Sequence, residues 1–449
     1  MRIKIDYGIY LGVTHAAIAR MENGVPVILK TDTSKDFIPI CVNFNENQNI
    51  LVGDSVLGAH KIDSIRVSKG FGLKYKNSFL EFTRTLGTDS NYFSPIMNRY
   101  FSSEELVAEI FKKLKSAVTD EDIPSIVITV PAKFTLNQRD ATIKAAKLAG
   151  FKHIELLQEP IAAFLAYGLE LEKKDGFWLV FDFGGGTFDA ALLKVDEGIM
   201  KVIDTEGDNY LGGKNLDEAI VDEIIIPYLA DNFSIDNILA DNDKKEILRG
   251  AMKFYAEEAK IQLSFRESHN ILSELGDIPG EDENGNEFEL DINISQQDLE
   301  AVFAPIFQKT ITICKELLNR NKLSGSQLGA LILVGGPTYS PILRKMLREQ
   351  VTYKVDTSCD PMTAVAKGAA LYASTINVSE EIIQILPLII NQTITSDLLR
   401  TKLINVYADN PVIPKDKFTE LFNKLYDIKK YENNTILLEE INNEIDNLR

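Results

Sequence analysis

The chain has 449 residues, of which 45% are hydrophobic and 25% are charged, a composition typical of a soluble globular protein with two or three domains. Its formal net charge of -18 excludes non-specific binding to nucleic acid or to an anionic membrane surface, because both need a positive field. With three scattered cysteines, no apolar leader and no apolar run long enough to cross a bilayer, the sequence predicts a cytoplasmic protein without a membrane or nucleic-acid partner.

Two segments of the chain share one pattern: an apolar run, a turn containing glycine, and a second apolar run. They are residues 3–20, IKIDYGIYLGVTHAAIAR, and residues 177–195, FWLVFDFGGGTFDAALLKV. A strand, a tight turn and a returning strand are the signature of a β-hairpin. Two such hairpins, one near the start of each half of the chain, predict a duplicated α/β unit.

Helices and strands are predicted to alternate after the first hairpin. In chain order they are a helix over 104–121, a strand over 125–132, a helix ending at Gly150, a mainly helical stretch over 216–267, a hairpin over 274–293, a long helix over about 296–320 and a strand over 330–336. This alternation predicts mostly buried sheets flanked by helices.

The strongest sign of phosphate chemistry is the turn of the second hairpin, DFGGGTFD over 182–189. Three consecutive glycines let the backbone turn so closely that several N–H groups can point at one anion, and the Thr187 hydroxyl adds a donor. Asp182 and Asp189 flank the turn, as expected where Mg²⁺ lies between carboxylate and phosphate. The alternative is a plain hairpin turn, for which one glycine suffices.

Two further turns are weaker signals on their own. The first hairpin turns at Gly12 and Thr14, and the segment 334–338 follows an apolar strand and leads into a helix. Free N–H groups at the start of a helix can bind an anion or a polar ring edge. Each of these turns could also be an ordinary connection.

Several stretches, in order, resemble segments of the seventy-kilodalton heat-shock chaperones, the DnaK-like family. They are residues 127–170 with the elements VPA, QR-AT and EP-AA-LAYGL, the phosphate loop FDFGGGTFD, GDNYLGGKNLD over 207–217, AEEAKIQLS over 256–264, LVGGPTYSP over 333–341 and PMTAVAKGAALYAS over 361–374. Together these motifs run over residues 3–374, about five-sixths of the chain. The resemblance implies a nucleotide-binding domain of the actin/sugar-kinase/heat-shock ATPase superfamily.

The implied fold is an α/β, two-lobed actin-like ATPase fold with duplicated ribonuclease-H-like subdomains. The nucleotide-binding domain would cover 1–374, with lobe I over about 1–171 and 350–374 and lobe II over about 172–349. ATP or ADP, with Mg²⁺, would bind between the lobes. The enzyme activity implied is hydrolysis of ATP to ADP and phosphate.

The family's site residues can be carried over to matching positions of this sequence. The implied nucleotide-binding residues are Gly12, Val13, Thr14, His15, Gly184, Gly185, Gly186, Thr187, Gly213, Glu257, Lys260, Ser264, Gly335, Gly336, Pro337 and Tyr339. The implied catalytic residues are Lys69, Glu159, Asp182, Thr187 and Asp189, with Asp182 and Glu159 near the metal. Pro131 and Arg139 match the relay between nucleotide state and interdomain contact. Lys69 has an alternative reading as a solvated surface lysine.

Two positions of the first hairpin depart from the family pattern. Tyr10 stands where the family has an aspartate that helps to hold hydrated Mg²⁺, and Val13 replaces a hydroxyl close to the γ-phosphate. A phenol is neutral at pH 7 and far bulkier than a carboxylate. Hydrogen bonds to charged groups are worth about 1.5–3 kcal/mol each, which predicts a loss of about one to two decades in affinity or rate. We therefore expect ATP binding with weak or absent hydrolysis.

The end of the chain is the second departure. The family follows its nucleotide domain with a β-sandwich that grips unfolded peptide and a helical lid, whereas residues 375–449 lack alternating strands and turns. Their apolar residues recur at three- and four-residue spacings, which predicts a helical tail in place of a dedicated peptide-binding sandwich domain. The tail is expected to pack on the nucleotide domain, with a partner protein as the alternative.

Three functions are compatible with these observations. The first is an ATP-regulated, chaperone-like protein that assists protein folding or binds a protein client or partner. The second is a pseudo-ATPase regulator or scaffold. The third is a small-molecule kinase of the same fold, against which the match over 127–170 argues.

Overall fold

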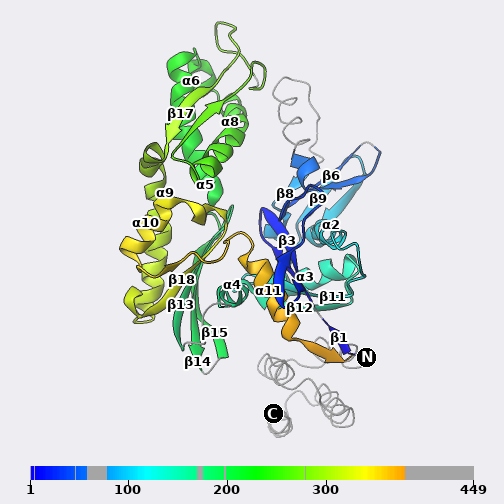
Figure 1. Cartoon of the computed structure of the whole chain (residues 1–449). Coiled ribbons are helices and arrows are strands. Elements are labelled where there is room, and N and C mark those ends of the chain that lie inside the picture. The colour runs from blue at the N-terminus through cyan, green and yellow to red at the C-terminus, as the bar shows by residue number, and fades with distance from the viewer. Residues whose placement is uncertain are drawn as a thin grey trace.

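The computed structural model describes residues 2–4, 6–45, 47–57, 78–168, 175–196, 199–278 and 280–379. These residues form two lobes, each built around one main β-sheet (Figure 1). The predicted two-lobed α/β fold is confirmed. Of the predicted helical tail, residues 375–379 are described: Thr375 ends a helix and the strand β20 (Asn377–Ser379) follows, while residues 380–449 lie outside the described part of the chain.

Within the described residues, lobe I contains one large sheet, smaller sheets and several helices. The strands of the large sheet are β2 (Tyr7–Leu11), β3 (His15–Glu22), β4 (Val25–Ile28), β5 (Ile38–Pro39), β11 (Ser125–Val130) and β12 (His153–Gln158). The small sheets contain β6 (Cys41–Phe44), β7 (Ile50–Val52) and β8 (Ser78–Leu80), and β9 (Asn91–Ser94) with β10 (Arg99–Ser102). The helices are α2 (Ser103–Lys115), α3 (Leu136–Leu148), α4 (Glu159–Tyr167) and α11 (Ala364–Thr375), with the short 3-10 helix η1 (Phe82–Thr85) after β8.

Lobe II contains a five-stranded sheet and the longest helices. Its sheet consists of β13 (Gly176–Phe183), β14 (Phe188–Asp196), β15 (Ile199–Asp208), β18 (Leu328–Val334) and β19 (Val355–Asp356). The helices are α5 (Gly213–Ile220), the π-helical turn η2 (Val221–Ile225), α6 (Ile226–Asn232), α7 (Asp236–Ala240), α8 (Asn242–Leu263), α9 (Gln296–Arg320), the 3-10 turns η3 (Gly325–Gln327) and η4 (Gly336–Tyr339), and α10 (Pro341–Gln350). A separate hairpin pairs β16 (Ser268–Leu272) with β17 (Asp291–Ser295).

The two main sheets have the same topology. In lobe I the strands lie in the order β12-β11-β2-β3-β4, and in lobe II the order is β19-β18-β13-β14-β15. In each sheet the first strand is central, the next two return as antiparallel neighbours, and the fourth pairs with the first in parallel. The duplicated α/β unit predicted from the two hairpins is therefore present.

The strands of lobe II are buried on both faces, which explains their continuous apolar runs. Along β13, the odd-numbered Leu179 and Phe181 pack into a core formed with α5, α8, α9 and α10. The even-numbered Trp178 and Val180 face the opposite way, into a core that includes residues of α4 and α11. Successive side chains of a strand point to opposite faces, so one strand can serve both cores.

The helices α4 and α11 lie between the two sheets (Figure 1). This layer is packed so closely that two positions accept only glycine. A Cβ on Gly368 of α11 would lie 1.7 Å from the carbonyl oxygen of Ala162 in α4. A Cβ on Gly8 of β2 would lie 2.4 Å from the backbone nitrogen of Ala370. Backbone therefore touches backbone in the layer formed by α4, α11 and β2.

The structure differs from the sequence prediction in two details. The strand β19 pairs in parallel with β18 and extends the sheet of lobe II, although the predicted boundary places residues 350–374 in lobe I. The paired strands of the predicted hairpin over 274–293 are shifted outward: β16 lies before that range and β17 begins inside it at Asp291, with one isolated bridge from Glu281 to Glu287 between them. Local turn chemistry predicted the Asn-Gly turn, but packing against α8 and α9 selected which residues pair.

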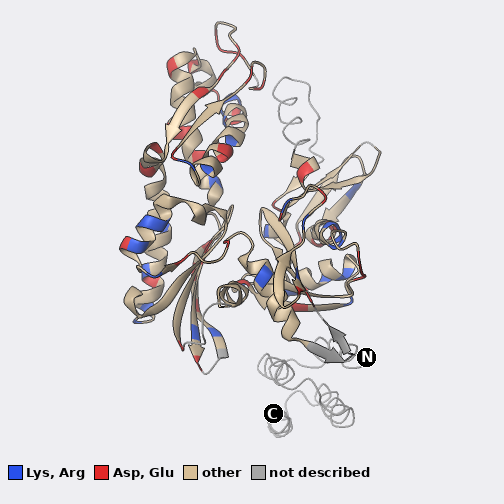
Figure 2. Ribbon diagram, in the orientation of Figure 1, with Lys and Arg blue, Asp and Glu red and all other residues tan. Residues whose placement is uncertain are grey.

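The strand β20 returns the chain to its beginning. It pairs antiparallel with β1 (Arg2–Lys4), and Ile3 lies opposite Val378. Acidic and basic residues are interspersed on many of the helices, whereas α4 and α11 are mostly uncharged (Figure 2). None of the helices in the described ranges is both long and apolar enough to cross a bilayer.

Candidate functional site

The turns of the two hairpins meet where the lobes face each other. A Cβ on Gly185, in the turn between β13 and β14, would lie 2.6 Å from the hydroxyl oxygen of Thr14, in the turn between β2 and β3. A Cβ on Gly186 would lie 3.9 Å from a methyl carbon of Val13. The structure thus brings together the two turns for which the sequence predicted phosphate contacts.

The carbonyl groups of the glycine triplet 184–186 all accept hydrogen bonds from other residues. The backbone N–H of Gly213 donates to the carbonyl of Gly184 at 2.9 Å, and the backbone N–H of Lys214 donates to the carbonyl of Gly185 at 2.9 Å. Nη2 of Arg84 donates to the carbonyl of Gly186 at 3.0 Å. Within the described ranges, no protein group accepts a hydrogen bond from the N–H of Gly185 or Gly186. A loop with its carbonyls engaged and its N–H groups unengaged can bind an anion.

Three acidic residues lie beneath this loop. Asp182 and Asp189 are directly opposite each other on β13 and β14, and Glu159, at the start of α4, is 8% exposed. Burial, together with the charge of Asp189, raises the pKa of Asp182 to about 7. Burial raises the pKa of Asp189 to about 6, although Lys133 opposes the shift. The pKa of Glu159 is raised by burial and then by the charges of both aspartates.

These acids could hold a cation near the loop. Their raised pKa values reflect buried negative charge without a matching positive charge, a balance that a divalent cation would reverse. Within the described ranges, however, no three His, Cys, Asp or Glu side chains are placed so that they could hold a metal ion together. A cation bound here would need water or phosphate oxygens as its other ligands.

Tyr10 lies next to these acids. Its hydroxyl oxygen would be 2.5 Å from a Cβ on Gly12, so the phenol covers the first turn from below. Burial raises the pKa of Tyr10 well above its ordinary value, and the nearby charges of Asp182 and Glu159 act in the same direction. The phenol is therefore neutral and contributes no charge to a cation at this place.

His15 connects the first turn to its surroundings. Its Nδ1 lies 3.0 Å from the hydroxyl oxygen of Thr14, and its ring meets Phe37 edge-on, with ring centroids 5.0 Å apart. Burial lowers the pKa of His15, against an opposing contribution from Glu257 on α8 of the other lobe. His15 is thus a neutral residue that faces lobe II.

The residues predicted for adenosine lie on α8 and η4. Lys260 contacts Asp217 with Nζ 2.6 Å from Oδ1, and it also donates to the carbonyl of Gly213 at 3.2 Å. Ser264 donates back to the carbonyl of Lys260 at 3.0 Å, and Glu257 is exposed. A Cβ on Gly213 would lie 3.0 Å from the ring of Pro337, so α8, the glycine loop and η4 converge.

The turn before η4 is held in place by its backbone. Gly335 has φ +90°, a conformation that favours glycine, and its N–H donates to the carbonyl of Pro361 at 3.0 Å. Gly336 follows as the first residue of η4, and Tyr339 is its last. The Tyr339 hydroxyl donates to the carboxylate of Asp360, and its ring packs against Phe265 with centroids 5.1 Å apart.

Some residues at the site were not predicted. Phe265 directly follows the motif that ends at Ser264. Its position next to that motif was the only feature of the sequence that could have indicated a place at the site. Arg84 lies outside the segments that carry the family resemblance, and nothing in the local sequence FTRT indicates that it contacts the glycine loop. The predicted Lys69 lies outside the described residues.

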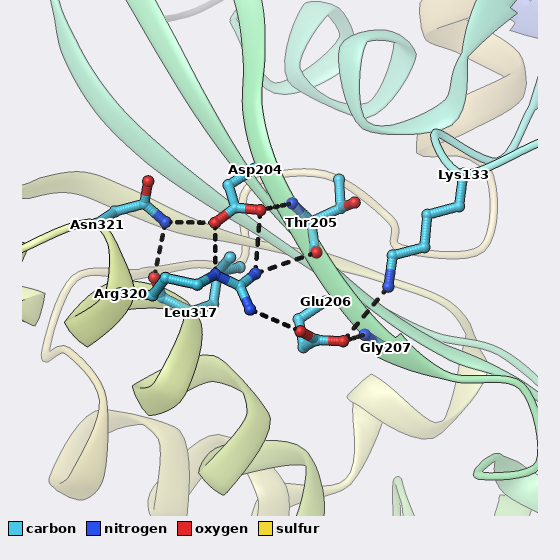
Figure 3. Close-up of polar contacts among 8 residues, drawn as sticks. All are labelled: Lys133, Asp204, Thr205, Glu206, Gly207, Leu317, Arg320 and Asn321. Atoms are coloured by element: carbon cyan, nitrogen blue, oxygen red, sulfur yellow. Dashed lines mark hydrogen bonds and ion pairs between the residues drawn. The ribbon is translucent and has the colours of Figure 1, made fainter.

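A second contact between the lobes involves the loop after β11. Pro131 begins this loop, and Arg139 lies in α3 beyond it. Lys133, between them, forms an ion pair with Glu206 of β15, with Nζ 3.5 Å from the carboxylate (Figure 3). Arg320 of α9 binds the same Glu206 and also Asp204, each at 2.8 Å (Figure 3). The loop between the two predicted relay residues therefore reaches lobe II through a network of charges.

Comparison with known proteins gives consistent results. Residues 6–440 match the family model described as Hsp70 protein. Similar proteins include three named chaperone protein DnaK. Those of Nitrosopumilus maritimus, Carsonella ruddii and Methanothermobacter thermautotrophicus are 31%, 31% and 32% identical to this chain over 380, 388 and 379 residues, respectively.

These matches cover 82%, 82% and 81% of this chain, but 56%, 63% and 58% of the three relatives. The chain therefore spans a little over half the length of the curated relatives that it matches. The family resemblance and the actin-like ATPase fold that it implies are confirmed by the family match and by the duplicated sheet topology. The chain belongs to the Hsp70 protein family.

Proposed function

We propose that the protein binds ATP or ADP between its lobes and that the nucleotide regulates its contacts with a protein client or partner. The observation that supports this best is the meeting of the two hairpin turns, where Gly185 lies against Thr14. The carbonyl groups of the glycine triplet accept hydrogen bonds from other residues. Within the described ranges, the N–H groups of Gly185 and Gly186 donate to no protein group and are available for phosphate oxygens. The Thr187 hydroxyl would add a further donor.

The ribose and the base are proposed to lie between α8 and η4. Lys260 supports this placement because its ammonium group lies beside Gly213, next to the phosphate loop. Glu257 is exposed one turn earlier on the same helix, where it could accept hydrogen bonds from ribose hydroxyl groups. The ring of Tyr339, together with Phe265, offers an aromatic surface for the base.

Mg²⁺ is proposed to accompany the nucleotide near Asp182 and Glu159. When bound, it would neutralise phosphate charge. The buried acids would hold its water ligands, because their ionised forms become favourable beside a divalent cation. Asp189 would share this role and would orient a water molecule near the phosphate chain.

Hydrolysis is proposed to be slow or absent. Tyr10 puts a neutral phenol beside Asp182 and Glu159, and Val13 puts a methyl group opposite the glycine loop. Phosphoryl transfer depends mainly on electrostatic positioning of phosphate, metal and water. The loss of one carboxylate and one hydroxyl therefore weakens catalysis more than it weakens nucleotide binding.

The binding proposal is tested by calorimetric titration with ATP or ADP in the presence of Mg²⁺, and by the thermal shift that a ligand of the native state produces. The change Gly185→Val should abolish both signals, because the added side chain would occupy the space of the Thr14 side chain. Gly250→Val is the matched control, since a Cβ at Gly250 meets nothing within 4 Å. The absence of heat and of thermal shift with the unaltered chain would reject the proposal.

A pseudo-ATPase regulator remains the second candidate, favoured by the same Tyr10 and Val13. The two candidates differ in turnover: the pseudo-ATPase binds ATP without releasing phosphate even when a client is added. Phosphate release measured with and without unfolded protein separates them. Phosphorylation of an added sugar would instead support a small-molecule kinase, a function against which the family match argues.

A further inference from the structure

We propose that Glu81, Arg84 and Lys214 form a clasp that joins the two lobes over the phosphate loop and controls how fast a bound nucleotide leaves. This inference rests on the proposed nucleotide function. It concerns regulation of that site, and it is carried by contacts of Glu81 and Arg84, which lie outside the sequence motifs, with Lys214 and the glycine loop.

Arg84 makes the first half of the clasp. It belongs to η1 of lobe I, yet its guanidinium donates to two backbone carbonyls of lobe II: Nη1 to Asn209 at 2.6 Å and Nη2 to Gly186 at 3.0 Å. A Cβ on Gly186 would lie 2.1 Å from Nη2, so the guanidinium sits directly on the glycine loop. An arginine presents its donors in a fixed planar fork, which suits two simultaneous acceptors.

Glu81 makes the second half. Its Oε2 accepts from Nε of Arg84 at 3.0 Å, while its other carboxylate oxygen, Oε1, forms an ion pair with the ammonium group of Lys214. The backbone of Glu81 has φ +58°, a left-handed conformation that is uncommon for residues other than glycine. Such conformations persist where surrounding contacts hold them, and they cluster at functional sites.

Lys214 connects the clasp back to the loop. It is the second residue of α5, and its backbone N–H donates to the carbonyl of Gly185 at 2.9 Å. The side chain of the same residue contacts lobe I through Glu81. The N–H groups of Gly185 and Gly186 would hold phosphate. Both residues are thus connected to residues 81–84 of lobe I, Gly185 through Lys214 and Gly186 directly through Arg84.

The clasp should act on nucleotide release. Separating the lobes at this place requires breaking two hydrogen bonds from a charged donor and one ion pair. The side chains of Arg84, Glu81 and Lys214 are 24%, 38% and 41% exposed, so water screens the ion pair only in part. Hydrogen bonds to charged groups are strong enough that losing them should speed separation by about tenfold or more.

The clasp differs from the other ion pair between the lobes. Lys133 and Glu206 are 3.5 Å apart, and their side chains are 44% and 35% exposed. That pair contacts neither the glycine triplet nor its neighbours. Within the described ranges, the clasp joins the two lobes and also contacts the phosphate loop, whereas the pair of Lys133 and Glu206 only joins the lobes.

The test measures dissociation of a fluorescent ADP analogue from the full chain with Mg²⁺, by stopped-flow mixing with excess unlabelled ADP. Arg84→Ala should release the analogue about tenfold faster or more. Arg84→Lys should lie in between, because an ammonium group cannot reproduce the two-carbonyl fork. Arg99→Ala is the control: Arg99 pairs with Glu105 inside lobe I, and its loss should leave the rate unchanged.

A double-mutant cycle checks that the residues act as one unit. Glu81→Gln and Lys214→Gln should each speed release, and the double change should add little to either single change. Because the ion pair between Glu81 and Lys214 joins the two lobes, added salt should speed release from the unaltered chain more than from Lys214→Gln. This salt comparison also serves as a check should one of the variants lose stability.

The outcomes separate the two proposals. If the unaltered chain binds no analogue, the proposed nucleotide function is rejected and the clasp with it. If the analogue binds but Arg84→Ala, Glu81→Gln and Lys214→Gln all release it at the rate of the unaltered chain, the nucleotide function stands and the clasp is rejected.

Discussion

Tyr10 shows how one side chain can alter the chemistry of an otherwise complete site. The phenol lies against Gly12 and beside Asp182 and Glu159, in a buried place where its pKa is raised. The phenol is bulky and carries no charge. A cation bound beside Asp182 and Glu159 would therefore gain no additional carboxylate from position 10. We therefore propose that Tyr10 weakens hydrolysis more than nucleotide binding.

At the residue scale we predict that the double change Tyr10→Asp with Val13→Thr raises ATP turnover by about tenfold or more, since it restores one carboxylate and one hydroxyl. Steady-state phosphate release measures this. Tyr10→Phe is the control, because it removes only the hydroxyl and should give no gain. A fast unaltered chain, or a double variant without any gain, would show that these two residues do not limit hydrolysis.

At the scale of elements, the contact between α4 and α11 decides how the lobes join. Gly368 lets α11 approach the backbone of Ala162, and α11 also packs on β2 at Gly8. α11 packs on the sheet of lobe I, and α4 contacts the sheets of both lobes. Small residues make this possible, because a larger side chain would hold the helices apart.

We predict that Gly368→Ala lowers the thermal stability of the protein, because its Cβ would fall 1.7 Å from the Ala162 carbonyl oxygen. Overpacking of this kind typically costs about 1–3 kcal/mol. Gly250→Ala on α8 is the control, since its Cβ meets nothing and alanine is the better helix former by about 1 kcal/mol. Thermal melts of the two variants should therefore shift in opposite directions. A Gly368→Ala melt like that of the unaltered chain would contradict the close contact.

At the scale of the whole molecule, the end of the described chain returns to its beginning. The strand β20 pairs with β1, so residues 377–379 complete lobe I rather than starting an independent tail. The amphipathic segments predicted beyond them lie outside the described residues, and their packing on the nucleotide domain stays a prediction. The match to the family continues to residue 440.

We predict that a chain shortened to end at Ser379 melts at a lower temperature than the full chain, because it loses the apolar faces expected to pack on the nucleotide domain. Ending the chain at Ser374 should lower it further, since β20 and its pairing with β1 are then lost. Differential scanning calorimetry compares the three chains. If the chain ending at Ser379 keeps full stability and solubility, a partner protein becomes the better candidate for those faces.

Sequence patterns were sufficient for the features that local chemistry governs. The glycine triplet 184–186 has to turn tightly and present N–H groups, whatever surrounds it. The two hairpins, the alternating strands and helices, and the family motifs all follow from residues adjacent in the chain. For the same reason, the departures at Tyr10 and Val13 can be recognised from the order of the amino acids alone.

Tertiary structure alone decided which distant residues share the site. Arg84 reaches the glycine loop from outside the segments that carry the family resemblance. Glu81, which has an unusual backbone angle, contacts Lys214 of the other lobe, and no motif indicates this contact. The strand β19 joined lobe II because its edge pairs with β18, although its place in the sequence suggested lobe I. Such contacts depend on how the two lobes lie relative to each other. The spacing and periodicity of residues in one sequence do not specify the relative placement of the lobes.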